Sequence, residues 1–197
     1  MIKDGLYDIP RGKIATIATH LEMLAPAPAR PVPAPEGVSF EQIKPDLDRY
    51  RDLFTRVGSL DWLWHGRLKM NEADLQAILS DPKVAIYTLR LDGQDEALLE
   101  LDFRQDGACQ LAYFGLTANL IGSGAGRFMM NQAISLAWAQ DITRFHVDTC
   151  TMDSPQALPF YIRSGFTPCA QQIEVRDDPR LDGILPRSAA PHVPIFD

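Results

Sequence analysis

The sequence predicts one α/β (α+β) domain whose central sheet is mixed, mostly antiparallel and flanked by helices. Three strand-like segments follow one another at residues 84–91, 98–104 and 109–116, and Asp-Gly pairs mark tight hairpin turns between them. A glycine-rich turn and a long apolar-periodic segment at residues 128–140 come next, which predicts strand, turn and helix. A length of 197 residues fits one domain with a sizeable core.

Composition narrows the functional class. The chain has no apolar run of membrane-spanning length, and its first residues lack the basic-then-apolar pattern of a signal peptide. We therefore expect a cytoplasmic protein with no membrane partner. The net charge of −7 argues against a nucleic-acid interface and would suit a cationic substrate such as an amine. A plain solvated surface would give the same charge.

Cysteine and histidine spacing gives no sign of a metal site or a disulfide framework. Cys109, Cys150 and Cys169 form no C-x-x-C pair, and their odd number argues against paired disulfides. The four histidines are scattered, so no metal site is expected. His146 and Cys150 lie four residues apart, which fits two half-buried strand residues better than a nucleophilic pair.

The N-terminal part reads as two strands joined by an extended loop. Residues 12–24 and 38–43 are strand-like, and five prolines between positions 26 and 35 exclude a helix there. Because about thirty residues are too few to fold alone, residues 1–37 are expected to join the same domain. Strand 38–43 then leads into the helical part of the chain.

Two helices should follow. Apolar residues share one face of residues 45–57, and Gly58 comes after them as a stop signal. Asn71 is a suitable N-cap for a helix over residues 71–79.

The glycine turn is the first candidate site. Gly122, Gly124 and Gly126 alternate, which lets a ligand lie directly on the backbone. The unpaired N–H groups of the next helical turn would favour an anion such as a phosphate or pyrophosphate. An ordinary helix-starting turn is one alternative. A Rossmann loop is another, although its spacing is G-x-G-x-x-G and it does not follow an antiparallel meander.

The C-terminal part predicts one more α/β unit and a tail. Residues 144–149 and 171–176 read as strands, and residues 155–164 as a helix that ends at Gly165. Residues 177–197 contain four prolines and should form an extended tail. This tail would either cap the substrate side or pack on the surface.

A second motif lies in this unit: Ala157-x-x-x-Tyr161-x-x-x-Gly165-Phe166. Together with the glycine turn, it resembles the two cofactor motifs of the GNAT superfamily of N-acetyltransferases. The first of those motifs is Gln/Arg-x-x-Gly-x-Gly/Ala and the second is Asn-x-x-Ala-x-x-x-Tyr-x-x-x-Gly-Phe. The resemblance covers roughly residues 83–174. Three positions depart from the motifs: Ala118, where Pro is frequent, Ile121 at the Gln/Arg position and Ser154 at the Asn position.

The resemblance implies a GNAT-like sheet with a V-shaped splay between its two central strands and acetyl-CoA (coenzyme A) as cofactor. Residues 83–176 would form the cofactor-binding core. The residues expected to bind the cofactor are Phe114, Gly115, Leu116, Ile121, Gly122, Ser123, Gly124, Ala125, Gly126, Arg127, Ser154, Ala157 and Tyr161. The resemblance also allows a homodimer.

The chemistry implied is direct attack of an amine on the thioester. Tyr161 occupies the position of the family's general acid, although without the family it would read as a core tyrosine. In the strand at residues 98–104, Leu99, Leu101 and Phe103 share one face, and Glu100 and Asp102 point the other way. Glu100, on this polar side, is the first candidate for the base, with a water relay or Tyr113 as alternatives. A solvated surface glutamate would fit the same pattern. The expected substrate-binding residues are Trp62, Trp64, Arg67, Glu100 and Tyr113. A buried connector would explain the two tryptophans equally well.

The sequence therefore predicts an N-acetyltransferase that moves an acetyl group from acetyl-CoA to a primary amine of a small molecule or peptide. A non-catalytic acyl-CoA-binding sensor on the same fold is the alternative, and a nucleotide-binding module is a more remote one. The identity of the amine depends on the aromatic segment at residues 62–70, on a hairpin formed by the first two strands, and on the tail. None of these segments contains a recognisable motif.

Overall fold

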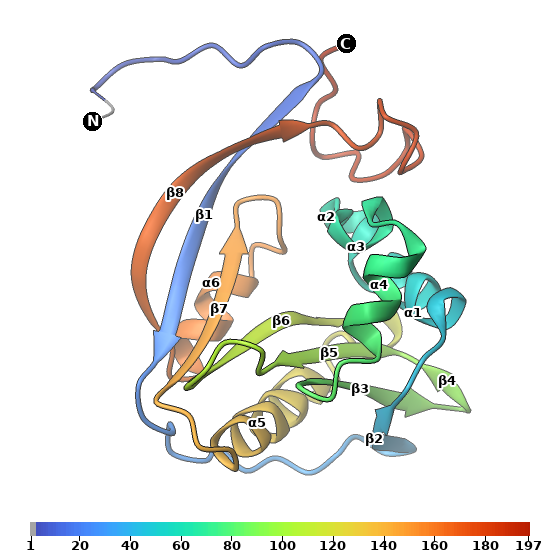
Figure 1. The fold of residues 1–197 in the computed structure, drawn as a ribbon, viewed down its shortest axis with the longest axis vertical. Helices are drawn as coiled ribbons and strands as arrows, with labels where there is room; N and C mark the ends of the chain where they lie inside the picture. Colours follow the sequence, from blue (N-terminus) through green and yellow to red (C-terminus); the bar gives the residue numbers. More distant parts are fainter. Residues whose placement is uncertain (1–2) are drawn as a thin grey trace.

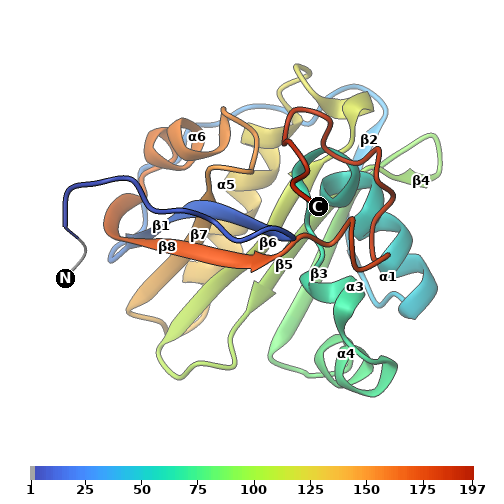
Figure 2. The same ribbon diagram turned by 90° about the horizontal axis from the view of Figure 1, so that it is seen from above.

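A computed structural model describes residues 3–197, which form one eight-stranded, mostly antiparallel sheet with helices on both faces (Figures 1 and 2). In chain order the elements are β1 (Lys13–Met23), β2 (Val38–Ile43), α1 (Leu47–Phe54), the π-helical η1 (Thr55–Ser59), α2 (Leu60–Trp62), α3 (Gly66–Lys69), α4 (Glu72–Leu79), β3 (Val84–Leu91), β4 (Gln94–Asp95), β5 (Ala97–Asp102), β6 (Ala108–Leu116), the 3-10 helix η2 (Ala118–Leu120), α5 (Ala125–Trp138), β7 (Arg144–Cys150), α6 (Ala157–Arg163) and β8 (Thr167–Asp177). The predicted mixed architecture is confirmed. No helix among these is long and apolar enough to cross a membrane.

The strand order is β2-β3-β5-β6-β7-β1-β8, with β4 paired to β3. Strands β3, β5 and β6 form the predicted antiparallel meander. The first turn is tight because Asp92 and Gly93 both have positive φ, as a two-residue hairpin turn requires. Strands β6 and β7 are the parallel pair of the sheet.

The first strand lies in an unexpected place. β1 does not neighbour β2; it inserts between β7 and β8, antiparallel to both. The proline-rich segment carries the chain from this end of the sheet to the other, where β2 pairs with β3 (Figure 1). The expectation that the first two strands lie together is therefore wrong.

Two cores cover the two faces of the sheet. On one face, α5 and α6 pack on β5, β6 and β7 around Met129, Ala133 and Phe145. On the other face, α1 and α4 pack through Tyr50, Phe54 and Leu75, among others, on β2, β3 and β5 (Figure 2). The predicted alternation of β5 is confirmed for Leu99 and Leu101, which both belong to the first of these cores. Its second face is buried rather than solvated, because these helices cover it.

Gly58 does not end the first helix. It lies inside the π-helical turn, and helix continues to Trp62 before Leu63 adopts a left-handed φ of 57°. The N-cap prediction for α4 is confirmed, because the Asn71 side chain accepts a hydrogen bond from the Asp74 N–H at 2.9 Å.

Candidate functional site

The parallel strands β6 and β7 separate after a short paired stretch. Only three residue pairs join them, from Ala108–Arg144 to Gln110–His146. Beyond Gln110 the two strands diverge, and a shift in the pairing of β5 with β6 leaves Ala112 as the extra residue. From Leu111 onward, within the part of the chain that the structure describes, no strand pairs with the β7-facing edge of β6.

The divergence opens a cleft of about 470 Å³. Most of the residues predicted for the site line it: Trp62, Trp64, Tyr113, Phe114, Gly115, Leu116, Ile121, Gly122, Gly124, Gly126, Ser154, Ala157 and Tyr161. Five predicted residues lie elsewhere: Arg67, Glu100, Ser123, Ala125 and Arg127. The sequence motifs and the open strand edge thus meet in one cavity.

The glycine turn forms one end of this cleft. Gly122 and Gly124 have φ values of 83° and 89°, a left-handed conformation that side chains disfavour. Helix α5 begins directly after them, with no side-chain cap at Gly124. Among residues 3–197, no acceptor takes the N–H groups of Gly126 and Arg127. The turn therefore presents free N–H donors and the positive end of a 14-residue helix.

Tyr161 lines the cleft from α6. Its ring packs against Phe114, Phe160 and Phe166, with centroid separations of 5.8–6.3 Å. Burial, and then the negative charge of Asp153, raise the pKa of the Tyr161 hydroxyl well above its usual value. The hydroxyl therefore carries its proton at neutral pH and can donate it.

Trp64 and Asp153 tie the two walls of the cleft together. The Trp64 Nε1–H donates to Asp153 Oδ1 at 3.0 Å. The other carboxylate oxygen of Asp153 accepts from the Thr149 hydroxyl and the Cys150 N–H, both at 2.8 Å. This bridge connects the segment after α2 with the end of β7. The aromatic wall of the cleft, formed by Trp62, Trp64 and Tyr113, therefore has a fixed position relative to the splay.

Close packing at Gly58 holds the Trp64 indole in place. A Cβ atom at position 58 would lie 2.1 Å from two atoms of this ring, so no side chain fits unless the indole moves. The bare backbone at Gly58 is therefore a requirement of the aromatic wall.

The change Gly58→Ala is expected to displace Trp64 from the cleft and destabilise the fold by about 1–3 kcal/mol, as overpacking does. Tryptophan fluorescence and thermal unfolding would detect both effects. Gly66→Ala serves as the control, because its added Cβ meets one atom, the Tyr113 hydroxyl, at 3.3 Å. An unchanged emission spectrum and melting temperature in Gly58→Ala would contradict this packing role.

Glu100 lies beside the cleft and is fully buried. Its carboxylate accepts a hydrogen bond from the Tyr50 hydroxyl at 2.5 Å and forms an ion pair with Arg67. The Arg67 guanidinium in turn lies 5.2 Å from the centre of the Tyr113 ring, which does line the cleft. Glu100 and Arg67 therefore support the wall from behind.

The C-terminal tail packs across the end of the cleft that contains Trp62. Leu185, Ala189 and Ala190 share a small apolar core with Ile14 of β1 and Leu63 after α2. The Trp62 ring contacts the His192 ring, with centroids 5.6 Å apart. The tail thus packs against both β1 and the segment around α2.

A buried arginine anchors the tail. Arg180 is paired with Asp178, and both side chains are almost completely buried. The Arg180 Nη1 also donates to the backbone carbonyls of Ala189, Ala190 and Val193 at 2.8–3.3 Å. This arrangement satisfies the charge and fixes the tail to the end of β8.

The sequence analysis did not identify two carboxylates that line the cleft. Asp148 and Asp153 both line it. Asp148 accepts from His20 on β1 at 2.5 Å, and this hydrogen bond raises the pKa of His20. The signal that could have found them is their position at the carboxyl end of a strand that precedes a helix, where ligands of α/β units collect.

No protein-family model matches the sequence, and no curated protein matches it. Solved structures do match the fold. A conserved protein of unknown function from Staphylococcus epidermidis superposes with a TM-score of 0.56 at 9% identity, and a GCN5-related N-acetyltransferase from Sphaerobacter thermophilus with a TM-score of 0.61 at 12% identity. An aminoglycoside acetyltransferase from a soil metagenome superposes with a TM-score of 0.50 at 14% identity.

The extent of these matches differs. The superpositions cover 85%, 86% and 65% of this chain, in the same order. The chain spans 64% and 53% of the length of the first two structures and 87% of the third. At such identities the likeness establishes the fold, which is the GNAT-like fold.

Proposed function

We propose that this protein is an acetyl-CoA-dependent N-acetyltransferase that acts on a primary amine of a small molecule or peptide. The observation that carries the proposal is the splay: two parallel strands part next to a glycine turn with free N–H donors. The fold neighbours that are acetyltransferases support the same activity class.

The residues present fit acetyl-CoA. The free N–H groups of Gly126 and Arg127 suit a pyrophosphate. The cleft is walled by Phe114, Leu116 and Phe160, which suits a long and largely apolar arm. The open edge of β6 offers backbone groups to the amides of that arm in the way that a neighbouring strand would.

When bound, acetyl-CoA would supply an activated acetyl group. Tyr161 would then hold a proton at its hydroxyl for the departing sulfur, because its raised pKa keeps it protonated. Backbone N–H groups near Gly115 would stabilise negative charge on the carbonyl oxygen. Asp148 and Asp153 would attract a cationic amine to the open part of the cleft.

Glu100 has a different role in this proposal from the one expected of it. A carboxylate that pairs with Arg67 and accepts from Tyr50 is not free to take a proton from an incoming amine. We assign Glu100 the role of a positioning residue that holds the Arg67 guanidinium against the face of the Tyr113 ring.

Acetyl-CoA is expected to raise the melting temperature by roughly 5–10 °C at a hundred times its dissociation constant, which corresponds to about 2.7 kcal/mol. NAD and ATP serve as controls and should give no shift. An amine panel followed by thiol release would then test turnover. The absence of a shift with millimolar acetyl-CoA would rule out the proposal, and binding without turnover would identify an acyl-CoA-binding module instead.

A further inference from the structure

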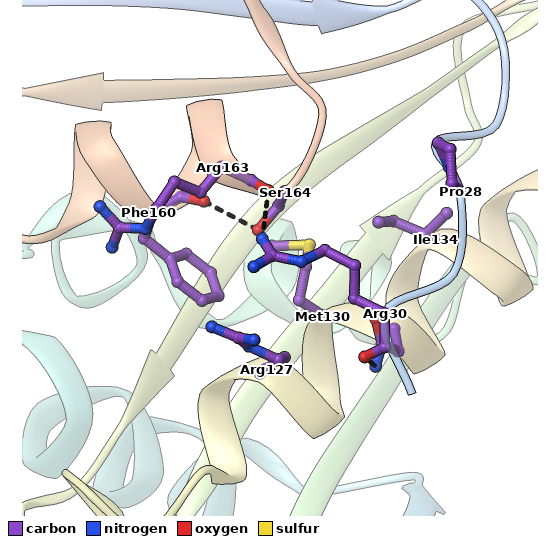
Figure 3. Close-up of a pocket in the computed structure, with 9 residues that line it drawn as sticks. Pro28, Arg30, Arg127, Met130, Ile134, Phe160, Arg163 and Ser164 are labelled. Atoms are coloured by element: carbon purple, nitrogen blue, oxygen red, sulfur yellow. Dashed lines mark hydrogen bonds between the residues drawn. The ribbon is translucent and has the colours of Figure 1, made fainter. Parts of the chain in front are cut away.

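A second, smaller pocket of about 40 Å³ lies outside the cleft, between α5, α6 and the proline-rich segment (Figure 3). Its charged residues are all arginines: Arg30 from the proline-rich segment, Arg127 from the first turn of α5 and Arg163 from the last turn of α6. No carboxylate lines it. A pocket of this composition suits an anion.

The ion pairs of the protein set these three arginines apart. Ten of the fourteen arginines lie within 4.0 Å of a carboxylate. Within residues 3–197, the four arginines without an Asp or Glu side chain within this distance are Arg11, Arg30, Arg127 and Arg163. Arg11 donates instead to the main-chain oxygen of Asp197, and the other three line this pocket. In a chain with a net charge of −7, such a concentration of unpaired positive charge indicates a site for a negatively charged ligand.

Specific contacts hold Arg30 at the pocket. Its backbone carbonyl accepts a hydrogen bond from the Asn131 side chain at 2.8 Å, and its Nη1 donates to the Arg163 carbonyl at 2.6 Å. Figure 3 shows the Arg30 guanidinium lying against the end of α6 at Ser164. The proline-rich segment also packs closely against Gly165, where an added Cβ atom would lie 2.4 Å from the Cβ of Ala27. Arg30 therefore reaches the pocket on a fixed backbone and keeps further N–H donors free.

The pocket and the cleft adjoin each other. Phe160 and Arg163 line both, and Arg127 follows Gly126 of the cleft directly in sequence. A ligand whose pyrophosphate lies on the glycine turn would thus have its nucleotide end near the three arginines. Coenzyme A carries a third phosphate at that end, a dianionic monoester on the ribose.

We propose that Arg30, Arg127 and Arg163 bind this ribose 3′-phosphate, so that the proline-rich segment is part of the cofactor site. The inference rests on the proposed function, because it takes coenzyme A as the ligand of the cleft. It extends the site to a segment outside the two sequence motifs.

The test compares coenzyme A with dephospho-coenzyme A, which lacks only that phosphate, by titration calorimetry at low salt. We expect coenzyme A to bind about 10- to 100-fold more tightly, the range for hydrogen bonds between charged groups. Equal affinities would overturn this inference and leave the proposed function standing. Binding of neither ligand would mean that the proposed function itself fails.

The variant Arg30→Gln sharpens the comparison. It should weaken coenzyme A binding about 10-fold and leave dephospho-coenzyme A binding unchanged. Arg11→Gln removes an equal charge outside the pocket, from an arginine whose Nη1 donates to the main-chain oxygen of Asp197, so it should leave both affinities unchanged. If Arg30→Gln weakened both ligands equally, Arg30 would not contact the 3′-phosphate and the inference would be wrong.

Discussion

The variant Tyr161→Phe is expected to lower kcat by about 10²–10⁴-fold, the usual contribution of a general acid, and to leave the KM for acetyl-CoA nearly unchanged. The reason is that only the hydroxyl is lost, while the ring keeps its packing against Phe114, Phe160 and Phe166. Initial rates of thiol release at saturating acetyl-CoA would measure the effect, once an amine substrate has been found.

Tyr113→Phe is the matched control. Tyr113 also lines the cleft, and burial raises the pKa of its hydroxyl as well. In the proposed reaction the Tyr113 hydroxyl transfers no proton, so the kcat of Tyr113→Phe should stay close to that of the parent protein. Turnover that survived in Tyr161→Phe, or an equal loss in both variants, would remove Tyr161 from the role of acid.

The pH profile offers a second check on Tyr161. Because its pKa is raised, the group stays protonated above pH 10, near which an ordinary tyrosine titrates. Deprotonation of the Tyr161 hydroxyl should therefore not lower kcat between about pH 7 and 10. A descending limb in this window that disappears in Tyr161→Phe would mean that the hydroxyl titrates there, contrary to the burial seen in the structure.

Local patterns in the sequence predicted the local parts of this structure well. The alternation of Leu99 and Leu101, the cap at Asn71 and the Asp-Gly turn at position 92 are properties of a few neighbouring residues, and the structure confirms each. The splay itself did not follow from such a pattern. It was expected from the resemblance, and its physical basis is the early end of pairing after Gln110.

Non-local features escaped prediction for a common reason. The site of β1 depends on partners more than a hundred residues away, as in the pairing of Ala18 with Cys150. The burial of Glu100 depends on helices that precede its strand and cover its second face. Gly58 reads as a stop signal, yet its bare backbone is needed by Trp64. None of these contacts leaves a periodic signal in the sequence.

Replacing Glu100 with alanine is expected to lower the free energy of unfolding by about 3–5 kcal/mol, the cost of breaking a buried ion pair from one side. The Arg67 side chain is 12% exposed and would keep its charge without a partner, and the Tyr50 hydroxyl would lose its acceptor. Since natural domains have about 5–15 kcal/mol of stability in total, urea unfolding should show the loss clearly.

A variant that removes the whole cluster separates the two roles considered for Glu100. Tyr50→Phe, Arg67→Met and Glu100→Leu together remove all the polar groups of this buried cluster, so none is left without its partner and most of the lost stability should return. If Glu100 only positions the wall, the combined variant should bind acetyl-CoA and retain part of its turnover, with a raised KM for the amine. If Glu100 were instead the base, the combined variant would lose turnover by about 10²–10⁴-fold even though its stability is restored. Because the carboxylate is already engaged by Arg67 and Tyr50, we expect the first result.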